Sequence, residues 1–245
     1  MTTPTASYYQ NVRALLEKVM ITQEHTIEVA AECIANCVRN GGIVYAFGCG
    51  HSGMMAQEMF YRAGGLVPVS AVFDERFMLH SGGRRSSQME RTEGLSNDLV
   101  ARYEMTAKDV LLVFSTSGIN PGPIDIVIAA KQIGIPVIGI TSSQYSHVSS
   151  RHSTGKHLSD VVDICIDNHV PYGDAVYPIG GDGIRVSPVS TVIGAYIVNS
   201  IVATVAQQLY QNGSLPSVFL SGNVPGGAEH NQIEIEKYLS RIPVL

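Results

Sequence analysis

The sequence predicts an α/β protein, a three-layer αβα sandwich around a five-stranded parallel sheet. Two observations favour this fold class. Five short apolar runs alternate with helical stretches, and the runs are continuous, as in strands that are buried on both faces. A glycine-rich turn, "GCGHSG" at 48–53, directly follows the first run, as it does in doubly wound sheets. We therefore expect the flavodoxin-like strand order 2-1-3-4-5.

The first 40 residues predict a helical hairpin in front of the sheet. Apolar residues recur three and four positions apart on both sides of Thr22, which is expected to cap the second helix. The sequence "NGG" at 40–42 is expected to end that helix. We therefore assign residues 1–40 to an N-terminal helical extension.

The predicted strands follow in order at 43–47, 66–73, 109–115, 135–141 and 161–166. Crossover helices are expected at 53–63 and 121–133, and a long apolar helix at about 188–211. Together these elements make a domain over 41–212. A Gly-rich loop is expected at 171–188 on the ligand edge of the sheet, and residues 213–245 are expected to form a C-terminal extension.

Composition excludes several classes of function. The chain has 245 residues, a net charge of −5 and 45% hydrophobic residues, so it can bury a core and is not suited to nucleic acid. No apolar run approaches the roughly 20 residues that cross a bilayer. The N-terminus lacks a signal-peptide pattern, and none of the four cysteines forms a CxxC pair. We expect a cytoplasmic protein with no membrane partner.

Two loops predict an anion site. The loop after the first strand is "GCGHSG", and the loop after the third is "STSGINPG" at 115–122. In the expected strand order these loops lie side by side, and their small hydroxyls and the N–H groups of a helix N-terminus would bind an anion. The cradle contains no lysine and no GxxxxGK[ST] motif, which favours a sugar phosphate over a triphosphate with magnesium. A sulfonate would also fit, and the serines could alternatively cap turns only. No metal or cofactor is expected.

These loops, with the strand "PVIGIT" at 136–141, resemble the sugar isomerase (SIS) domain family over roughly residues 40–212. The stretch 105–118 is similar to N-acetylmuramic acid 6-phosphate etherases, and the stand-alone architecture to phosphoheptose isomerases. The resemblance implies isomerisation of a phosphorylated or otherwise anionic sugar by a homodimer or homotetramer. It implies that the loop at 115–118 binds the phosphate and that Ser52, in the loop at 48–53, lines the sugar. The predicted binding residues are Gly50, Ser52, Ser115, Thr116, Ser117, Gly118 and Asn120.

Aldose–ketose isomerisation passes through an enediol and needs a carboxylate or imidazole near the reacting carbons. Glu93, in "QMERTEG" at 88–94, is the first candidate because etherases place a catalytic glutamate in a similar position; Glu90 competes with it. Alternatively, either glutamate could simply stabilise a helix N-terminus through its negative charge, with no catalytic role. Glu58 is a second candidate base, or an exposed helix residue. Arg62 stands where the resembling enzymes carry a glutamate, which is a departure from their pattern.

Two histidines are candidates for the acid that opens the sugar ring. His51 lies inside the glycine turn, and His230 lies in the C-terminal segment, from which SIS enzymes often complete a site. Either could instead be an ordinary surface histidine.

Three alternatives stay open. One is a SIS-type lyase or etherase with the same anionic substrate class. Another is a regulatory protein that binds a sugar phosphate without catalysis. The third is an NAD enzyme, since Gly48-x-Gly50-x-x-Gly53 matches the dinucleotide pattern and Asp74 lies 21 residues beyond Gly53. Against NAD stand the absence of a Tyr-x-x-x-Lys pair in the sequence and the lack of any role there for "STSG".

Overall fold

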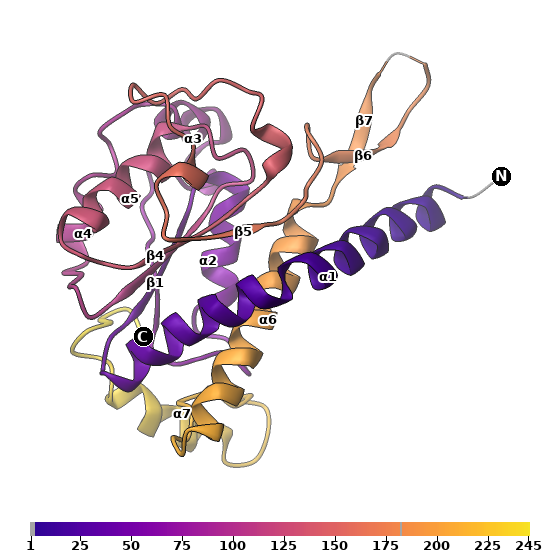
Figure 1. The fold of residues 1–245 in the computed structure, drawn as a ribbon. Coiled ribbons are helices and arrows are strands. Elements are labelled where there is room, and N and C mark those ends of the chain that lie inside the picture. Colours follow the sequence, from indigo (N-terminus) through magenta and orange to yellow (C-terminus); the bar gives the residue numbers. More distant parts are fainter. Residues whose placement is uncertain (1–2, 182) are drawn as a thin grey trace.

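A parallel five-stranded sheet forms the centre of the computed structural model, which describes residues 3–181 and 183–245 (Figure 1). The strands lie in the order β2-β1-β3-β4-β5, and every neighbouring pair is parallel. This confirms the predicted fold class and strand order. Their bounds are β1 (Val44–Gly48), β2 (Val69–Ala71), β3 (Val110–Phe114), β4 (Val137–Thr141) and β5 (Ile164–Asp167).

Alternate side chains of each strand enter two separate cores. Val44 and Ala46 of β1 join one core, beneath α1 (Pro4–Arg39), α2 (Gly53–Met59) and α6 (Ser190–Gln211). Tyr45 and Phe47 join the other, beneath α3 (Gly83–Glu90), α4 (Leu99–Arg102) and α5 (Pro121–Gln132). Because both faces are covered, the strands have the continuous apolar sequences from which they were predicted.

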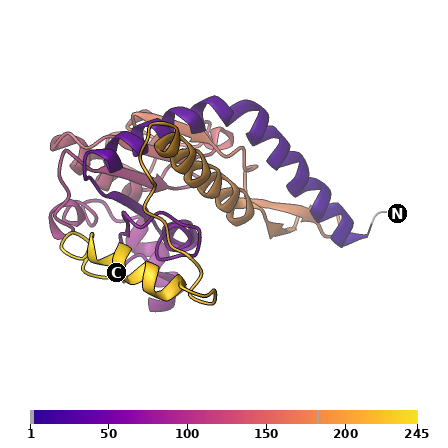
Figure 2. The same ribbon diagram turned by 90° about the horizontal axis from the view of Figure 1, so that it is seen from below.

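The N-terminal hairpin prediction is wrong, because α1 is one helix of 36 residues. Thr22 does not begin a second helix; its hydroxyl donates to the Lys18 carbonyl one turn earlier, at 2.8 Å, which a helix interior tolerates. The apolar stripe continues through this point, from Val19 to Ile27, along α6. Figure 1 shows α1 crossing α6 at an angle, with the first turns of α1 extending beyond it, and Figure 2 shows the two helices on the same side of the molecule.

Helix α6 is long and apolar enough, by length and composition, to cross a membrane. The sequence prediction of no such segment therefore missed it. In this fold 44% of its apolar window is buried, and Ile193, Ile197 and Ile201 are fully enclosed. A core helix of a packed domain satisfies the same test, and one face of α6 packs in the core with α1 and α2.

The Gly-rich stretch after β5 is not a plain loop. It contains an antiparallel pair, β6 (Ala175–Pro178) and β7 (Arg185–Pro188), that projects from the body beside the first turns of α1 (Figure 1). The Tyr8 hydroxyl donates to the Pro188 carbonyl at 3.0 Å. Short 3₁₀ turns complete the loops, namely η1 (Gly50–Ser52), η2 (Leu79–Ser81), η3 (Ser143–Tyr145) and η4 (Leu158–Asp160).

The C-terminal segment packs near the amino ends of the strands. Val218 forms a bridge with Leu66, which precedes β2, and α7 (Gly227–Glu236) follows. Arg241 contacts both oxygens of the fully buried Asp109 carboxylate, at 3.0 and 2.8 Å, and Asp109 directly precedes β3. The carboxyl ends of the strands, at the opposite edge, are therefore not covered by this segment of the same chain.

Candidate functional site

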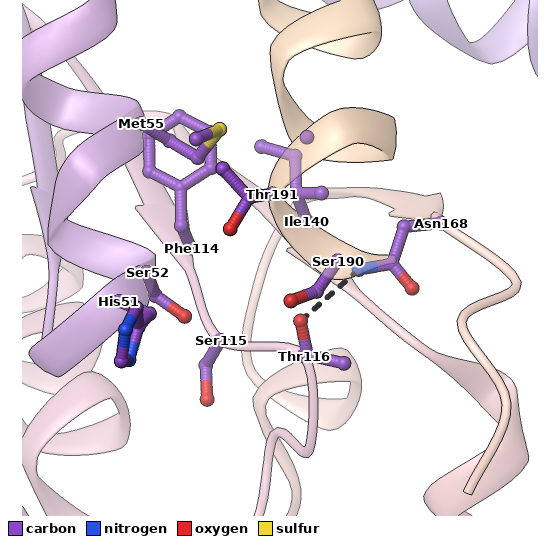
Figure 3. A pocket seen from close by; sticks show the side chains of 11 residues that line it. His51, Ser52, Met55, Phe114, Ser115, Thr116, Ile140, Asn168, Ser190 and Thr191 are labelled. Carbon is purple, nitrogen blue, oxygen red and sulfur yellow. Dashed lines mark hydrogen bonds between the residues drawn. The ribbon is translucent and has the colours of Figure 1, made fainter. Parts of the chain in front are cut away.

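A pocket of about 270 Å³ opens at the carboxyl ends of β1 and β3, where the predicted loops meet. A smaller recess adjoins it and is lined by the start of α6 as well as by both loops (Figure 3). The strand order accounts for this location, since β1 and β3 are neighbours whose crossovers leave in opposite directions. The main pocket is lined by Cys49, Gly50, His51, Ser52, Leu79, Ser86, Ser87, Glu90, Ser115, Thr116, Ser117, Asn120, Tyr145, Asp174 and Ser190.

The glycines of the first loop serve the turn itself. A Cβ on Gly48 would lie 2.6 Å from the backbone of Ser52, and one on Gly53 would lie 2.9 Å from the Gly48 carbonyl oxygen. Gly50 has a φ of +57°, in the left-handed region that favours glycine. The turn therefore brings the chain back against the end of β1, and it leaves His51 and Ser52 at the pocket.

The second loop offers donors from its backbone. In the part of the chain that the structure describes, the N–H groups of Thr116 and Ser117 have no hydrogen-bond partner. The Ser115 hydroxyl accepts from the Gly118 N–H at 3.2 Å, which is the turn-capping role considered as an alternative. Its own proton is still free to donate. Gly118 has a φ of +63°, and its added Cβ would lie 2.6 Å from Thr141 Oγ1.

Most of the N–H groups available to an anion belong to the loop after β3, and few belong to helix α5, which follows it. Helix α5 begins with Pro121, Gly122 and Pro123, so two of its first three residues have no N–H group. The predicted contribution of a helix N-terminus is therefore reduced to the N–H groups of Asn120 and Gly122. This leaves the Thr116 and Ser117 amides as the main backbone groups for an anion.

Glu90 faces this cradle from the end of α3. It accepts a hydrogen bond from Asn120 Nδ2 at 2.8 Å, and Asn120 Oδ1 in turn accepts from Arg151 at 2.6 Å. Burial raises the pKa of Glu90, and the Asn120 hydrogen bond and the nearby Arg91 and Arg151 charges oppose that rise only in part. A half-buried carboxylate with a raised pKa beside an anion cradle is suited to proton transfer.

Glu93, the first sequence candidate, lies elsewhere. It is exposed, and its carboxylate accepts from the Ser153 N–H at 2.9 Å and from the Ser153 hydroxyl. These two hydrogen bonds lower the pKa of Glu93. It lines a separate recess with Asp125 and His152, outside the main pocket. Glu93 therefore ties the 146–157 loop to the loop after α3.

Two further candidates are also separated from the pocket within this chain. Glu58 points from α2 toward α6, where it pairs with Arg62 at 2.5 Å and accepts from Asn199 at 3.0 Å. His230 lies on α7, near the amino edge of the sheet, and its Nε2 contacts the Val218 carbonyl at 2.9 Å. The structure thus brings His51 and Glu90 together at one pocket, but not Glu58, Glu93 or His230.

Several pocket residues were missed in the sequence. Ser190 and Thr191 begin α6, and Asn168 follows β5; all three border the recess in Figure 3. Asn168 Nδ2 donates weakly to Thr116 Oγ1, at 3.5 Å. The position of these three residues after the last strand of the sheet was the available signal. Asp174 also lines the main pocket, and it belongs to the Gly-rich loop that was expected on the ligand edge. Its carboxylate accepts from the Val189 and Ser190 N–H groups and so caps α6.

Asp74 is not free to bind a ribose. Its carboxylate accepts from Arg76 at 2.9 and 2.7 Å and from Arg102 at 2.6 Å. Burial alone would raise the pKa of Asp74, but these hydrogen bonds outweigh it and lower the pKa. The feature that favoured a dinucleotide is therefore a structural ion pair. Among the described residues no group of three or more His, Cys, Asp or Glu side chains could hold a metal ion.

Known proteins resemble this chain over most of its length. The family model described as "SIS domain" matches residues 7–142. The UPF0309 protein BH0227 of Halalkalibacterium halodurans is 44% identical over 240 residues, which cover 98% of this chain and 96% of the relative.

Two solved structures share the fold. A phosphoheptose isomerase from Francisella tularensis has a TM-score of 0.56 at 21% identity, over 84% of this chain and all of that one. The Vibrio vulnificus NanR protein, complexed with ManNAc-6P, has a TM-score of 0.53 at 15% identity, over 97% of this chain and 69% of that one.

Proposed function

This chain belongs to the SIS domain family, and from that premise we propose that it isomerises an anionic sugar, aldose to ketose, with Glu90 as the base. One observation carries the proposal. The half-buried Glu90 carboxylate, with its raised pKa, lines the same pocket as Ser115, Thr116 and Ser117 of the anion loop. A proton acceptor and an anion cradle therefore face one space.

Binding would use the groups that are otherwise unpaired. The phosphate, or a sulfonate, would accept from the Thr116 and Ser117 N–H groups and from the hydroxyls of Ser115 and Ser52. Hydrogen bonds to a charged acceptor are stronger than neutral ones, so four of them can hold a dianion without a lysine. Glu90 and Asp174 line the same pocket, and their carboxylates would accept from the neutral hydroxyls of the sugar.

Proton transfer would then follow from the position of Glu90. Its carboxylate takes the proton from C2 of the open-chain aldose, and the C1 carbonyl oxygen gains a proton, which gives the cis-enediol. Glu90 then returns its proton to C1 while the C2 hydroxyl gives up its proton, which replaces the one taken up by the C1 oxygen, and the product is the ketose. The raised pKa matters because a base whose pKa lies nearer neutrality both removes and returns a proton efficiently.

His51 is the proposed ring-opening acid. It is exposed at the pocket mouth and belongs to the turn that carries Ser52 (Figure 3). An imidazole there can protonate the ring oxygen as the C1 hydroxyl loses its proton. His230 keeps a role in this scheme only if another subunit supplies it.

A second candidate function is binding of a sugar phosphate without catalysis, and one neighbour shows that this fold can hold such a ligand. NanR shares the fold and was solved with a sugar phosphate, ManNAc-6P. A lyase acting on the same enediolate would also use Glu90. These alternatives share the cradle and differ in what happens at C2.

We also propose that the chain forms a homo-oligomer through α1 and α6. Met20, Ile21 and Val192 are exposed apolar residues on these two helices. An interface between copies would bury these side chains, as the closed symmetry of most homo-oligomers allows. Light scattering at micromolar concentration tests this; a monomer at all concentrations would contradict it.

The decisive experiment measures exchange at C2. The protein is incubated in deuterated water with a panel of sugar phosphates and sulfonates, chosen first by thermal shift, and proton NMR records loss of the C2 signal. Isomerisation predicts exchange together with ketose formation. Exchange with loss of a substituent indicates a lyase, whereas tight binding without exchange indicates a regulator. No binding by any anionic sugar would overturn the proposal.

A further inference from the structure

A second pocket lies beside the candidate site, at the carboxyl ends of β4 and β5. It has a volume of about 280 Å³, similar to that of the main pocket. The proposed isomerisation gives it no role, because the base and the anion cradle lie at the first pocket. Its lining residues are Ser117, Thr141, Ser142, Ser143, Tyr145, Ser146, His157, Ser159, Asp160, Cys165 and Asp167.

The two pockets share a wall. Ser117, from the anion loop, and Tyr145, from η3, line both of them. Tyr145 is held in place, because its hydroxyl accepts from the Gly173 N–H at 3.0 Å and its ring packs on Tyr172 with centroids 5.1 Å apart. One ligand that passes Ser117 and Tyr145 would therefore contact both pockets.

The lining of the second pocket suits a hydroxyl-rich group. Six serine and threonine hydroxyls line it. Those of Thr141 and Ser142 already donate to the Thr116 and Val170 carbonyls, and the other four can both donate to and accept from a ligand. Sugar hydroxyls have the same dual capacity. The ring of Tyr145 supplies an apolar face, as is usual in ligand pockets whose few polar groups fix orientation.

Charge restricts the occupant further. Asp160 and Asp167 line the second pocket, and no lysine or arginine is among its lining residues. Asp167 accepts from the Ser143 and His169 N–H groups, and Asp160 from the His157 N–H, so both carboxylates are held in position. A second anionic group would be repelled here, whereas neutral hydroxyls can donate to these carboxylates.

We propose that this pocket is a second subsite, for a neutral sugar ring linked to the anionic sugar in the first pocket. The ligand of this protein is then a glycosylated sugar phosphate or sulfonate, larger than a simple hexose phosphate. The inference rests on the proposed function for the anionic half of the ligand, and on the second pocket alone for the neutral half.

A blocking variant tests the second pocket by itself. Ser159 is exposed at the pocket rim, so Ser159→Tyr introduces a ring there without disturbing the core. Ser149→Tyr is the matched control, since Ser149 is an exposed serine of the neighbouring loop that does not line the pocket. Circular dichroism and melting temperature verify that both variants fold.

Two binding measurements then follow. Calorimetry compares monosaccharide 6-phosphates with disaccharide phosphates that carry one added neutral ring. We expect the added ring to tighten binding about tenfold in the wild type and in Ser149→Tyr, which is about 1.4 kcal/mol. Ser159→Tyr should lose that gain and keep its affinity for the monosaccharide phosphates. Saturation-transfer NMR with neutral methyl glycosides should give a signal with the wild type and with Ser149→Tyr, but not with Ser159→Tyr.

The two proposals can fail separately. If no anionic sugar binds but the neutral glycosides give the Ser159-dependent signal, the proposed function fails and the second subsite stands. If monosaccharide phosphates bind and exchange while the added ring brings no gain and the glycosides no signal, the second subsite is overturned. Equal weakening of both ligand classes by Ser159→Tyr would also overturn it.

Discussion

The side-chain amide of Asn120 donates a hydrogen bond of 2.8 Å to the carboxylate of Glu90. This contact joins the end of α3 to the start of α5, across the mouth of the candidate site. Asn120 makes no side-chain hydrogen bond to the helix that it precedes, so its amide is used for Glu90 and Arg151. The pair fixes a half-buried carboxylate where the anion loop ends and α5 begins.

Replacing this carboxylate tests the proposed base. Glu90→Gln keeps the shape of the side chain and its contact with Asn120 but cannot take a proton. We expect the C2 exchange rate to fall about 10²–10⁴-fold while sugar-phosphate binding is retained. Glu93→Gln is the matched control, because Glu93 lies outside the pocket and contacts Ser153. The reverse pattern, with Glu93→Gln inactive and Glu90→Gln active, would reassign the base.

The same variant should change stability with a definite sign. Because the folded-state pKa of Glu90 is raised, the folded chain binds this proton more tightly than the unfolded chain does. The contribution of Glu90 to the free energy of unfolding therefore falls as the pH rises. The fall begins at the ordinary pKa of glutamate, about 4.3, and is complete above the raised pKa of the folded chain. We expect Glu90→Gln to have the larger free energy of unfolding at pH 7, with the difference vanishing near pH 4. Urea titrations at both values measure it; a less stable variant at pH 7 contradicts the burial argument.

Asn120 should set the acid limb of the pH–rate profile. Its hydrogen bond lowers the pKa of Glu90, so Asn120→Ala should raise that pKa further and move the limb to higher pH. The C2 exchange rate is measured from pH 4 to 9 in both proteins. Asn97→Ala, an exposed asparagine of the neighbouring recess, serves as control and should leave the limb unmoved. A limb that shifts to lower pH in Asn120→Ala would show that this hydrogen bond does not stabilise the charged form.

Ser117 should contribute to anion binding and little to the fold. Its side chain is half-buried and lines the pocket. Losing one hydrogen bond to a charged group costs about 1.5–3 kcal/mol, so Ser117→Ala should weaken binding by at least about tenfold. Calorimetry with a sugar phosphate measures this, and the melting temperature without ligand should stay constant. Ser149→Ala controls for the loss of a loop serine; equal affinity in both variants would remove Ser117 from the cradle.

The sheet and its ligand edge were predictable from the sequence because their signals are local. A continuous apolar run such as "IVYAF" indicates a buried strand, and strand order then puts Ser52 and Ser117 at one edge. The single helix α1 was missed for a related reason. Thr22 is a good N-cap in isolation, and only the uninterrupted packing along α6 shows that the helix continues.

The choice of carboxylate depended on information that the sequence does not hold. Glu90 and Glu93 are three residues apart in one polar stretch, so spacing could not separate them. Helix α3 ends at Glu90, and the chain then turns away, so that the first carboxylate faces Asn120 and the second faces Ser153. His230 was favoured by position in the chain, yet its segment packs at the other edge of the sheet.

The glycine turn should not tolerate a side chain at Gly48, because there is no space for one. An added Cβ would lie 2.6 Å from the Ser52 backbone, which cannot move aside as a side chain could. We expect Gly48→Ala to lower the free energy of unfolding by about 2–3 kcal/mol and to weaken sugar-phosphate binding in the molecules that still fold. Gly222→Ala is the control, because its added Cβ would meet nothing within 4 Å. Denaturant titration and calorimetry measure both effects. Equal stability of the two variants would show that the turn relaxes freely and that Gly48 does not determine where Ser52 lies.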